Sequence, residues 1–284
     1  MMSRRAGKGK RTILVDVLLH GGIVVVALAF LFPLFWTVSN ALRSNSDVLS
    51  VPPHLLPHSV EWMNFVRIWV YLPFGRFFLN SLFVATAVAA ITLVVSSASA
   101  YAFARLRFPF KDSLFVVYLG TLMIPQAILV VPLFMMMSRL GWVNSYQALI
   151  IPMAFSSFGT FLLRQFFLQI PYELEHAAQI DGASRLRILF SIVVPMSVTP
   201  LGLLALFTFT ANWNSFLWPL IVVNDAAHTT LPLGITQFQS QQGTQWNYLM
   251  AGTVITMLPG ILLTLLLQRY IFRSFQVGSA FGGR

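Results

Sequence analysis

The sequence contains no cysteine and very little charge. Without cysteine the chain has no disulfide bonds and no thiolate metal sites. Asp, Glu, Lys and Arg make up only 9% of the 284 residues, whereas soluble domains have about 25% charged residues. Apolar residues take their place, because 57% of the chain is hydrophobic and the mean hydropathy is +0.77. We therefore expect an integral membrane protein.

Charge is also missing from the middle of the apolar segments. Asp16 and His20 lie in the first turns of the first segment and Arg164 lies near the end of the fourth, but no acid or lysine lies at any centre. This argues against a proton-coupled carrier, because ionisable groups inside spans usually form ion relays. No nucleophile has a His or Asp partner there, which argues against an intramembrane hydrolase. We expect no catalytic residue, no metal site and no cofactor bound by this chain.

Six apolar segments are long enough to cross a membrane, which takes about 20 residues in a helix. The sequence thus predicts an all-α membrane protein with a basic N-terminus at 1–12, a transmembrane domain at 13–273 and a tail at 274–284. The first segment follows a charged start but has no clear small-x-small cleavage site, so we interpret it as a retained span. The predicted spans are residues 13–39, 79–104, 113–137, 143–168, 188–223 and 248–272.

The distribution of Lys and Arg predicts the orientation. Fourteen lie in the N-terminus, the second–third loop, the fourth–fifth loop and the tail, and only four lie on the other side. The positive-inside rule then places both termini in the cytoplasm. On the outer side, Ser59 is predicted to cap a short interfacial helix with Trp62, Phe65, Val66 and Trp69 on one face. Prolines within the spans permit kinks; they are Pro125, Pro132, Pro152, Pro195, Pro200 and Pro259.

The stretch "ELEHAAQIDGAS" at 173–184 is unusually polar for this chain. Pro171 suits the first turn of a helix and Gly182 suits the position that ends one. Between them, small and polar residues recur at helical spacing on one stripe, and Ser184 can cap the next helix; the stripe is Leu174, Ala177, Ala178 and Asp181. The pattern predicts a short helix on the inner membrane surface, which is either a docking site for another protein or a simple linker between two spans.

A longer stretch, "IPYELEHAAQIDGASRLRILFSIVVPMSVTP", resembles the EAA loop of binding-protein-dependent ABC importer permeases. The stretch "NSLFVATAVAAITLVVSSASAYAFARLRFPFK" is similar to the second span and inner loop of carbohydrate-type permeases. Three further stretches are similar to later landmarks of the subunit that resembles the smaller maltose permease: "GWVNSYQALIIPMAFSSFGTFLLRQFF", "WNSFLWPLIV" and "QRYIFRSFQVGSAFGG". The resemblance covers nearly the whole chain. It implies one of two permease subunits of an importer for a sugar or oligosaccharide; the alternatives are a glycerol-phosphate-type polyol importer, a secondary carrier or a membrane scaffold.

The resemblance also implies partners and roles. The partners are a second permease, two cytoplasmic ATPases that hold the ATP and Mg, and an extracytoplasmic substrate-binding protein, in the cytoplasmic membrane of a prokaryote. The loop 169–187 would carry the coupling helix that docks on an ATPase. Its expected coupling residues are Leu174, Glu175, His176, Ala177, Ala178, Asp181, Gly182 and Ala183. His176 replaces the family's glutamate before the two alanines, so Glu175 is a candidate for the polar contact.

Three further groups of residues have expected roles. The tail residues Gly278, Ser279, Ala280, Phe281 and Gly282 resemble a family tail that contacts the ATPases, although Phe281 stands where the family is usually small. Asn212, Trp213, Asn214 and Trp218 are candidates for the translocation path or for helix packing. The outer loop residues Gln241, Gln242, Gly243 and Gln245 are candidates for contact with the binding protein or for a solvated loop.

Overall fold

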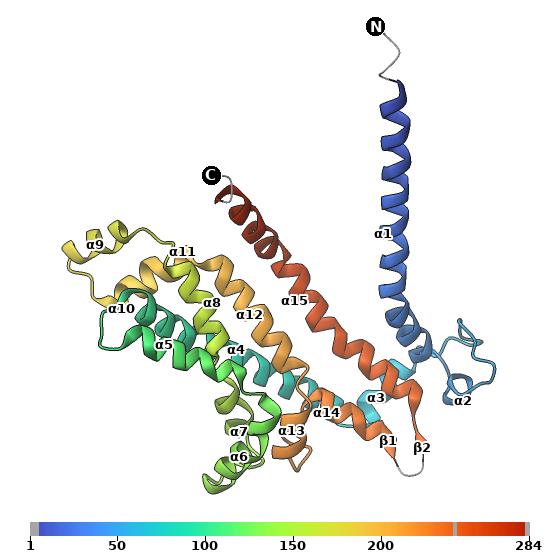
Figure 1. Ribbon diagram of the computed structural model, residues 1–284. Coiled ribbons are helices and arrows are strands. Elements are labelled where there is room, and N and C mark those ends of the chain that lie inside the picture. Colours follow the sequence, from blue (N-terminus) through green and yellow to red (C-terminus); the bar gives the residue numbers. More distant parts are fainter. Residues whose placement is uncertain (1–5, 241–242, 282–284) are drawn as a thin grey trace. The chain divides into compact units, whose positions relative to one another are not determined.

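The computed structural model describes residues 6–240 and 243–281, which fold almost entirely into helices (Figure 1). The chain divides into two compact units, and each is described by itself. One unit comprises Met1–Tyr71 with Gln237–Ile255, and the other comprises Leu72–Thr236 with Thr256–Arg284. The all-helical class that the sequence predicts is confirmed. The one sheet among the described residues is a β-hairpin with two residues in each strand.

The first unit is assembled around a buried asparagine. Its elements are α1 (Ala6–Ala41), α2 (Asn45–Val48), α3 (Asn64–Tyr71), β1 (Gln239–Ser240), β2 (Gly243–Thr244) and the first part of α15 (Trp246–Phe281). Asn64 Nδ2 donates to the carbonyl oxygens of Ala41 at 2.9 Å and Arg43 at 2.8 Å. Asn64 Oδ1 accepts from Asn247 Nδ2 at 3.2 Å. One side chain therefore ties α3 to the end of α1 and the start of α15.

The predicted interfacial helix exists, but its start differs from the prediction. The helix begins at Asn64, and the Ser59 hydroxyl donates to Glu61 Oε1 at 3.4 Å and does not cap it. The buried face consists of Asn64 and Ile68, because the hydrogen bonds of Asn64 turn that side toward the unit. Trp62 and Val66 are exposed, as an apolar face at a membrane interface would be.

The second unit is built on the long helix α4 (Phe74–Arg105) (Figure 1). The helices that follow it along the chain are α5 (Lys111–Gly120), η1 (Thr121–Met123), α6 (Gln126–Arg139), α7 (Tyr146–Ile150), η2 (Ile151–Met153), α8 (Ser157–Phe167), α9 (Tyr172–Ile180), α10 (Arg185–Ile188), η3 (Leu189–Val193, a π-helix), α11 (Val194–Met196), α12 (Val198–Trp213), α13 (Leu217–Val222) and α14 (Leu231–Ile235). The short η4 (Thr236–Phe238) crosses the boundary to the first unit.

Helices α8 and α12 pack closely against α4, and a glycine permits the approach. A Cβ added at Gly159 of α8 would lie 2.6 Å from Ser96 Oγ on α4 and 3.1 Å from Leu204 on α12. Small residues at helix crossings let the backbones of membrane helices approach each other. Thr92 of α4 also donates to the carbonyl oxygen of Ala154 at 3.1 Å. The centre of this unit is therefore a three-helix contact.

The predicted spans agree with three single helices and three bent pairs. By length and composition, Val15–Ala41, Phe74–Arg105 and Trp246–Leu266 can each cross a membrane alone. The other predicted spans are helix pairs bent by 98° (Lys111–Met123 with Gln126–Arg139), 43° (Tyr146–Met153 with Ser157–Phe167) and 84° (Arg185–Met196 with Val198–Trp213). The described residues thus hold three to six candidate spans. The fifth predicted span, 188–223, is too long, because its helix ends at Trp213 and α13 follows after a break.

Proline lies at each of the three bends. Pro125 directly precedes α6, Pro152 lies in η2, and Pro195 lies in α11. Proline has no backbone N–H to donate and its ring crowds the preceding turn, so a helix bends or stops there. Pro132 and Pro259 instead lie inside α6 and α15. The kinks that the sequence predicts are therefore present, and at three positions they separate two helices.

Candidate functional site

The boundaries of α9 follow from its local sequence. Pro171 immediately precedes the helix, and Asp181 ends it. Gly182 adopts φ +77°, the left-handed conformation that glycine accepts without a Cβ clash. Gly182 N donates to Gln179 O at 3.0 Å and Ala183 N donates to Ala178 O at 2.9 Å, which is the Schellman pair of bonds that closes a helix end. The predicted helix end at Gly182 is confirmed.

Ser184 starts the next helix, also as predicted. Its hydroxyl accepts a hydrogen bond from Arg187 N at 3.3 Å, so it caps α10. Only Gly182 and Ala183 lie between the C-cap of α9 and this N-cap. Because both ends of this connection are fixed by hydrogen bonds, α9 cannot move far without moving α10.

Glu175 of α9 is buried and bonded to α4. Its side chain is 2% exposed, and its Oε1 lies 2.8 Å from Arg105 Nε. Tyr101 OH donates to Glu175 Oε2 at 3.2 Å. The Arg105 Nη2 group donates to the carbonyl oxygens of Phe167 and Ile170, at the end of α8. One arginine thus joins the end of α4, the end of α8 and α9.

The Arg105–Glu175 contact is an ion pair without an aligned hydrogen bond. The two atoms lie within 4 Å, but the Nε hydrogen does not point at the oxygen, and neither atom has a hydrogen-bond partner in the described structure. The Arg105 side chain is 0% exposed. Removing one member of a buried pair leaves the other charge uncompensated, at a cost of about 3–5 kcal/mol. The pair therefore attaches α9 firmly to the membrane helices.

This finding corrects one expectation. Glu175 is a candidate, from the sequence, for the polar contact to an ATPase that His176 does not provide. Such a contact needs an accessible carboxylate, whereas Glu175 is buried against Arg105 and Tyr101. The stretch 173–184 alone cannot show this, because the burial of Glu175 depends on Arg105, 70 residues earlier in the chain.

Helix α9 has an attached stripe and an exposed stripe. On the attached side, Tyr172 lies under the guanidinium of Arg105, whose Cζ is 4.0 Å from the ring centroid, and Ala178 packs against the core of α4, α8 and α10. Elsewhere on the helix Leu174 is 42% and Ile180 is 87% exposed. Of the expected coupling residues, Leu174, His176, Ala177, Asp181 and Gly182 are exposed, and Ala178 and Ala183 are partly buried.

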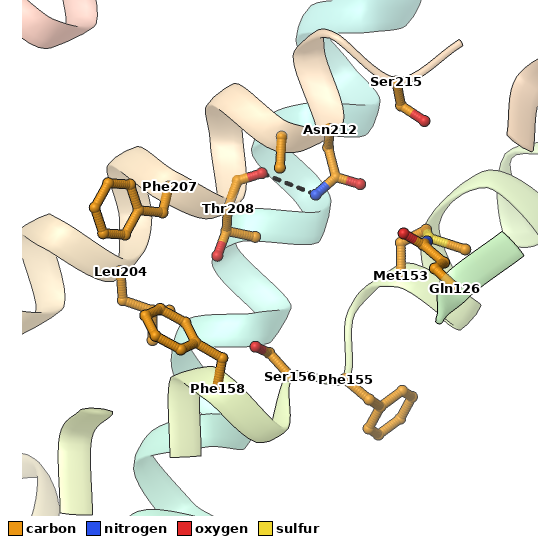
Figure 2. A pocket seen from close by; sticks show the side chains of 11 residues that line it. Gln126, Met153, Phe155, Ser156, Phe158, Leu204, Phe207, Thr208, Asn212 and Ser215 are labelled. Carbon is orange, nitrogen blue, oxygen red and sulfur yellow. Dashed lines mark hydrogen bonds between the residues drawn. The ribbon is translucent and has the colours of Figure 1, made fainter. Parts of the chain in front are cut away.

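A second candidate site is a cavity of about 300 Å³ next to α12 (Figure 2). Asn212 lies on its wall, where its Nδ2 donates to Thr208 O at 2.8 Å and its oxygen points away from Thr208 (Figure 2). An adjoining cavity of about 270 Å³ shares Gln126, Met153, Ala211 and Ser215 with it. Every described side chain that lines the two cavities is uncharged. This wall offers amide and hydroxyl groups among apolar ones.

Of the four candidate path residues, only Asn212 lines one of these two cavities with a polar side chain that faces it. Trp213 is 1% exposed, donates from Nε1 to Thr256 O at 2.9 Å and stacks on Phe209. Trp218 is 4% exposed and donates to Ala148 O at 2.9 Å; it only borders the smaller cavity. Asn214 is exposed and donates to Thr210 O at 3.0 Å. For both tryptophans the packing alternative therefore agrees with the structure.

Several residues of this wall were not predicted from the sequence. Gln126, Ser156, Thr208 and Ser215 contribute its other polar groups. A signal was available for two of them. Gln126 follows Pro125 at the break of a span, and Ser156 caps α8 by accepting from Gly159 N at 2.9 Å. Backbone breaks inside membrane proteins occur where the chain lines a cavity or is buried in protein, so polar residues beside such breaks are candidates.

The outer-loop and tail candidates are described only in part. Gln241, Gln242 and Gly282 lie outside the described residues. Gly243 begins β2 at φ +127° and pairs with Ser240. Gln245 N donates to Phe238 O at 3.0 Å, and its side chain is half-buried. Gly278, Ser279, Ala280 and Phe281 continue α15 beyond the predicted span end at 272. The contacts expected for these residues remain predictions.

The end of α4 opposite Arg105 is held by neutral groups. Asn80 is 4% exposed, and its Nδ2 donates to Ala227 O at 2.9 Å and Thr229 O at 2.8 Å. Its Oδ1 accepts from Tyr146 OH at 2.7 Å. Asparagine can make these three bonds at once because its amide has donors and an acceptor.

An aspartate orders the loop beside it. Asn144 Nδ2 donates to Asp225 Oδ2 at 2.8 Å, and His228 N and Nδ1 lie 2.9 Å and 3.0 Å from Oδ1. The bond from Asn144 is the main cause that lowers the pKa of Asp225 to about 2; slight burial opposes it and His228 assists. In the described part of the chain, no three His, Asp or Glu side chains gather as a metal site would require.

Comparisons with known proteins agree with this architecture. Residues 97–277 match the family described as "Binding-protein-dependent transport system inner membrane component". The sn-glycerol-3-phosphate transport system permease protein UgpE of Pectobacterium atrosepticum is 40% identical over 266 residues, covering 91% of this chain and 95% of the relative. UgpE of Agrobacterium fabrum is 32% identical over 270 residues, covering 92% and 94%.

Among solved structures, a bacterial ABC transporter involved in import of the acidic polysaccharide alginate has a chain with a TM-score of 0.80 and 21% identity, covering 95% of this chain and 99% of that one. At that identity the likeness concerns the fold alone. The chain is a multi-pass permease subunit of a bacterial inner membrane and is not itself an ATPase. It belongs to the family of inner membrane components of binding-protein-dependent transport systems.

Proposed function

We propose that this permease forms half of the translocation path of an ABC importer for a phosphorylated polyol of the sn-glycerol-3-phosphate type. The observation that carries this proposal is the 32–40% identity, over more than 90% of the chain, to permeases named for that substrate. The proposal replaces the sugar or oligosaccharide that the sequence alone favours. A second permease, cytoplasmic ATPases and a periplasmic binding protein complete the importer.

The wall around Asn212 suits the polyol part of such a substrate. Its side chains carry amides and hydroxyls, which can donate to and accept from alcohol groups. The described lining carries no cation. The charge of the phosphate is therefore met elsewhere, by the partner permease or by the binding protein, and this chain contacts the uncharged end.

Helix α9 is the coupling element in this proposal. Closure of the ATPases around ATP moves the exposed side of α9, and the buried Arg105–Glu175 pair transmits the movement to α4 and α8. The short hydrogen-bonded connection through Gly182 transmits it to α10. From there η3 and α11 lead to α12, which carries Thr208 and Asn212 on the cavity wall. ATP binding thus shifts the population between inward- and outward-open states.

The substrate is tested with the assembled importer in proteoliposomes. The purified complex is reconstituted with its binding protein outside the vesicles and ATP enclosed inside them. These proteoliposomes should accumulate labelled sn-glycerol-3-phosphate and should not accumulate maltose or free glycerol. Accumulation of a neutral disaccharide in preference to the phosphate ester would overturn the substrate proposal and restore the sugar alternative.

The coupling role of α9 is tested with Gly182→Phe. Any side chain at Gly182 is strained by its φ of +77°, but a Cβ there meets nothing within 4 Å in this chain. Beyond that strain, the phenyl group therefore disturbs the closely docked ATPase more than it disturbs the permease. We expect substrate-stimulated ATP hydrolysis to fall toward the basal rate while the complex still assembles. Unchanged stimulation would remove the role given to α9.

A further inference from the structure

A basic cavity lies beside α9, and the proposed coupling route uses only its Arg105–Glu175 pair. The cavity has a volume of about 700 Å³ and is bordered by the end of α4, residues 106–107, α9 and α10. Tyr172, Glu175, His176 and Gln179 line it from α9 at helical spacing. Arg105, Arg107 and Arg185 line it from the other segments. Three guanidinium groups therefore face one carboxylate.

The charges in this cavity are not balanced. Glu175 pairs with Arg105. Arg107 and Arg185 are exposed and form no ion pair among the described residues, although Arg185 interacts with Tyr101, the residue that donates to Glu175. Arg105 Nη1 is buried and has no hydrogen-bond partner in the described structure. Two positive charges and one unfilled buried donor group remain on the lining, so the cavity is suited to an anion.

The surroundings of the cavity indicate that the anion belongs to a protein. The same helix exposes Ile180 at 87% and Leu174 at 42%. Inorganic phosphate in the cavity would leave these apolar side chains in water. A protein surface that covers α9 removes them from water, which stabilises the complex, and it can place an acidic side chain among the arginines in the same contact.

We infer that the ATPase that docks on α9 inserts a carboxylate side chain into this cavity, between Arg107, Arg185 and His176. The inference rests on the proposed function, because it takes α9 as the docking helix. It assigns cationic groups to the permease and an anionic group to the ATPase. Arg105 and Glu175 hold α9 in place, and the other basic groups around them select the partner.

The sign of the contact is tested by charge reversal in the assembled complex. The permease pair is placed in nanodiscs, and the dissociation constant (Kd) of the ATPase is measured at low and high salt. His176→Glu and Arg107→Glu should each raise this Kd about tenfold or more at low salt. The uncharged variants His176→Gln and Arg107→Gln should each raise it by less, about threefold, because they remove the original donor group without adding repulsion.

Arg139→Glu is the matched control. Arg139 is exposed at the end of α6, which lies far from α9 within the same unit (Figure 1). The same change of charge there should leave the Kd unchanged. Retention of the second permease and of the melting temperature shows that a variant is folded. If Arg107→Glu does not assemble, the exposed His176→Glu decides the question.

Three results would overturn the inference. A lower or unchanged Kd for His176→Glu would mean that the ATPase presents a base or a neutral group there. Loss of the Arg107→Glu effect in nanodiscs without anionic lipid would identify a lipid headgroup as the anion. Suppression of the effect by inorganic phosphate at constant ionic strength would identify free phosphate. Uptake of sn-glycerol-3-phosphate by the unmodified importer is measured separately, so a wrong substrate is distinguished from a wrong contact.

Discussion

The two ends of α4 are held by different chemistry. At one end Arg105 forms a buried ion pair with Glu175 and donates to two carbonyl oxygens at the end of α8. At the other end Asn80 makes three neutral hydrogen bonds to Ala227, Thr229 and Tyr146. Ionic contacts are long-ranged and tolerate small displacements, whereas neutral hydrogen bonds weaken steeply with poor geometry. The comparison therefore separates an end of α4 that is held by a buried charge pair from an end that is held by neutral hydrogen bonds.

The largest loss of stability should come from Glu175→Gln, which removes the ion pair with Arg105 at the charged end of α4. The variant keeps the shape of the side chain but leaves the Arg105 charge buried without a counter-charge, at a cost of about 3–5 kcal/mol. Hydrogen exchange of the amides in 172–180 should accelerate, and substrate-stimulated ATP hydrolysis should fall. The control is Glu173→Gln on the same helix, which is exposed. Equal exchange in the two variants would show that the ion pair does not hold α9.

Asn80→Ala should have the second largest effect, at the neutral end. It leaves the carbonyl oxygens of Ala227 and Thr229 and the Tyr146 hydroxyl without their partner, which costs about 3 kcal/mol in total. The free energy of unfolding in detergent should fall accordingly, while coupling of ATP hydrolysis to substrate in the surviving complex should be retained. Tyr146→Phe removes one of the three bonds, so it should cost about 1 kcal/mol. A loss of substrate-stimulated ATP hydrolysis in Asn80→Ala would contradict the distinction between the two ends of α4.

Gly182→Ala should have a smaller effect on stability. Its φ of +77° is strained for alanine, but the surrounding space is open, so the cost is about 1 kcal/mol of backbone strain. The matched control is Gly120→Ala, because Gly120 has φ −56° and also has nothing within 4 Å. That substitution should leave stability unchanged or slightly raised. If both substitutions shift the melting temperature equally, the helix end at Gly182 is not held in the left-handed conformation.

The pH dependence at Asp225 should be the smallest effect. The pKa of Asp225 is about 2 in the folded protein and near 3.8 ordinarily. The unfolded chain therefore binds the proton first, and the stability from this carboxylate is present above pH 3.8 and lost as the pH falls toward 2. Asp225→Asn should lower the melting temperature at neutral pH and flatten its decline in acid. An unchanged acid profile would show that the bond from Asn144 contributes no stability.

Much of the fold could be predicted from the sequence, because membrane crossing imposes length and composition. The helix end at Gly182 and the cap at Ser184 were also predictable, since each depends on a residue and its nearest neighbours. The angle between the two helices at Pro125 was not predictable, because proline permits a bend but the packing of the helices sets the bend angle. The end of the fifth span at Trp213 was missed because residues 214–222 are nearly as apolar as a span.

The sites were harder to predict than the fold. Glu175 and His176 are adjacent in sequence, yet one is buried and the other is exposed. Which face of α9 meets the membrane helices is decided by Arg105, which periodicity within 173–184 does not reveal. Tyr172, Glu175 and Gln179 do share a stripe, and a search for a basic residue at the end of the preceding spans would have proposed Arg105 as its partner.

The separate stripes of α9 have an evolutionary consequence. Residues such as Ala177 and Ile180 point outward and make few demands on the rest of the permease, whereas Glu175 and Ala178 secure the helix from beneath. Substitutions on the outward side can accumulate without loosening the attachment. After duplication, two importers in one cell can therefore come to use separate ATPase subunits, or continue to share one, while the membrane helices of their permeases stay unaltered.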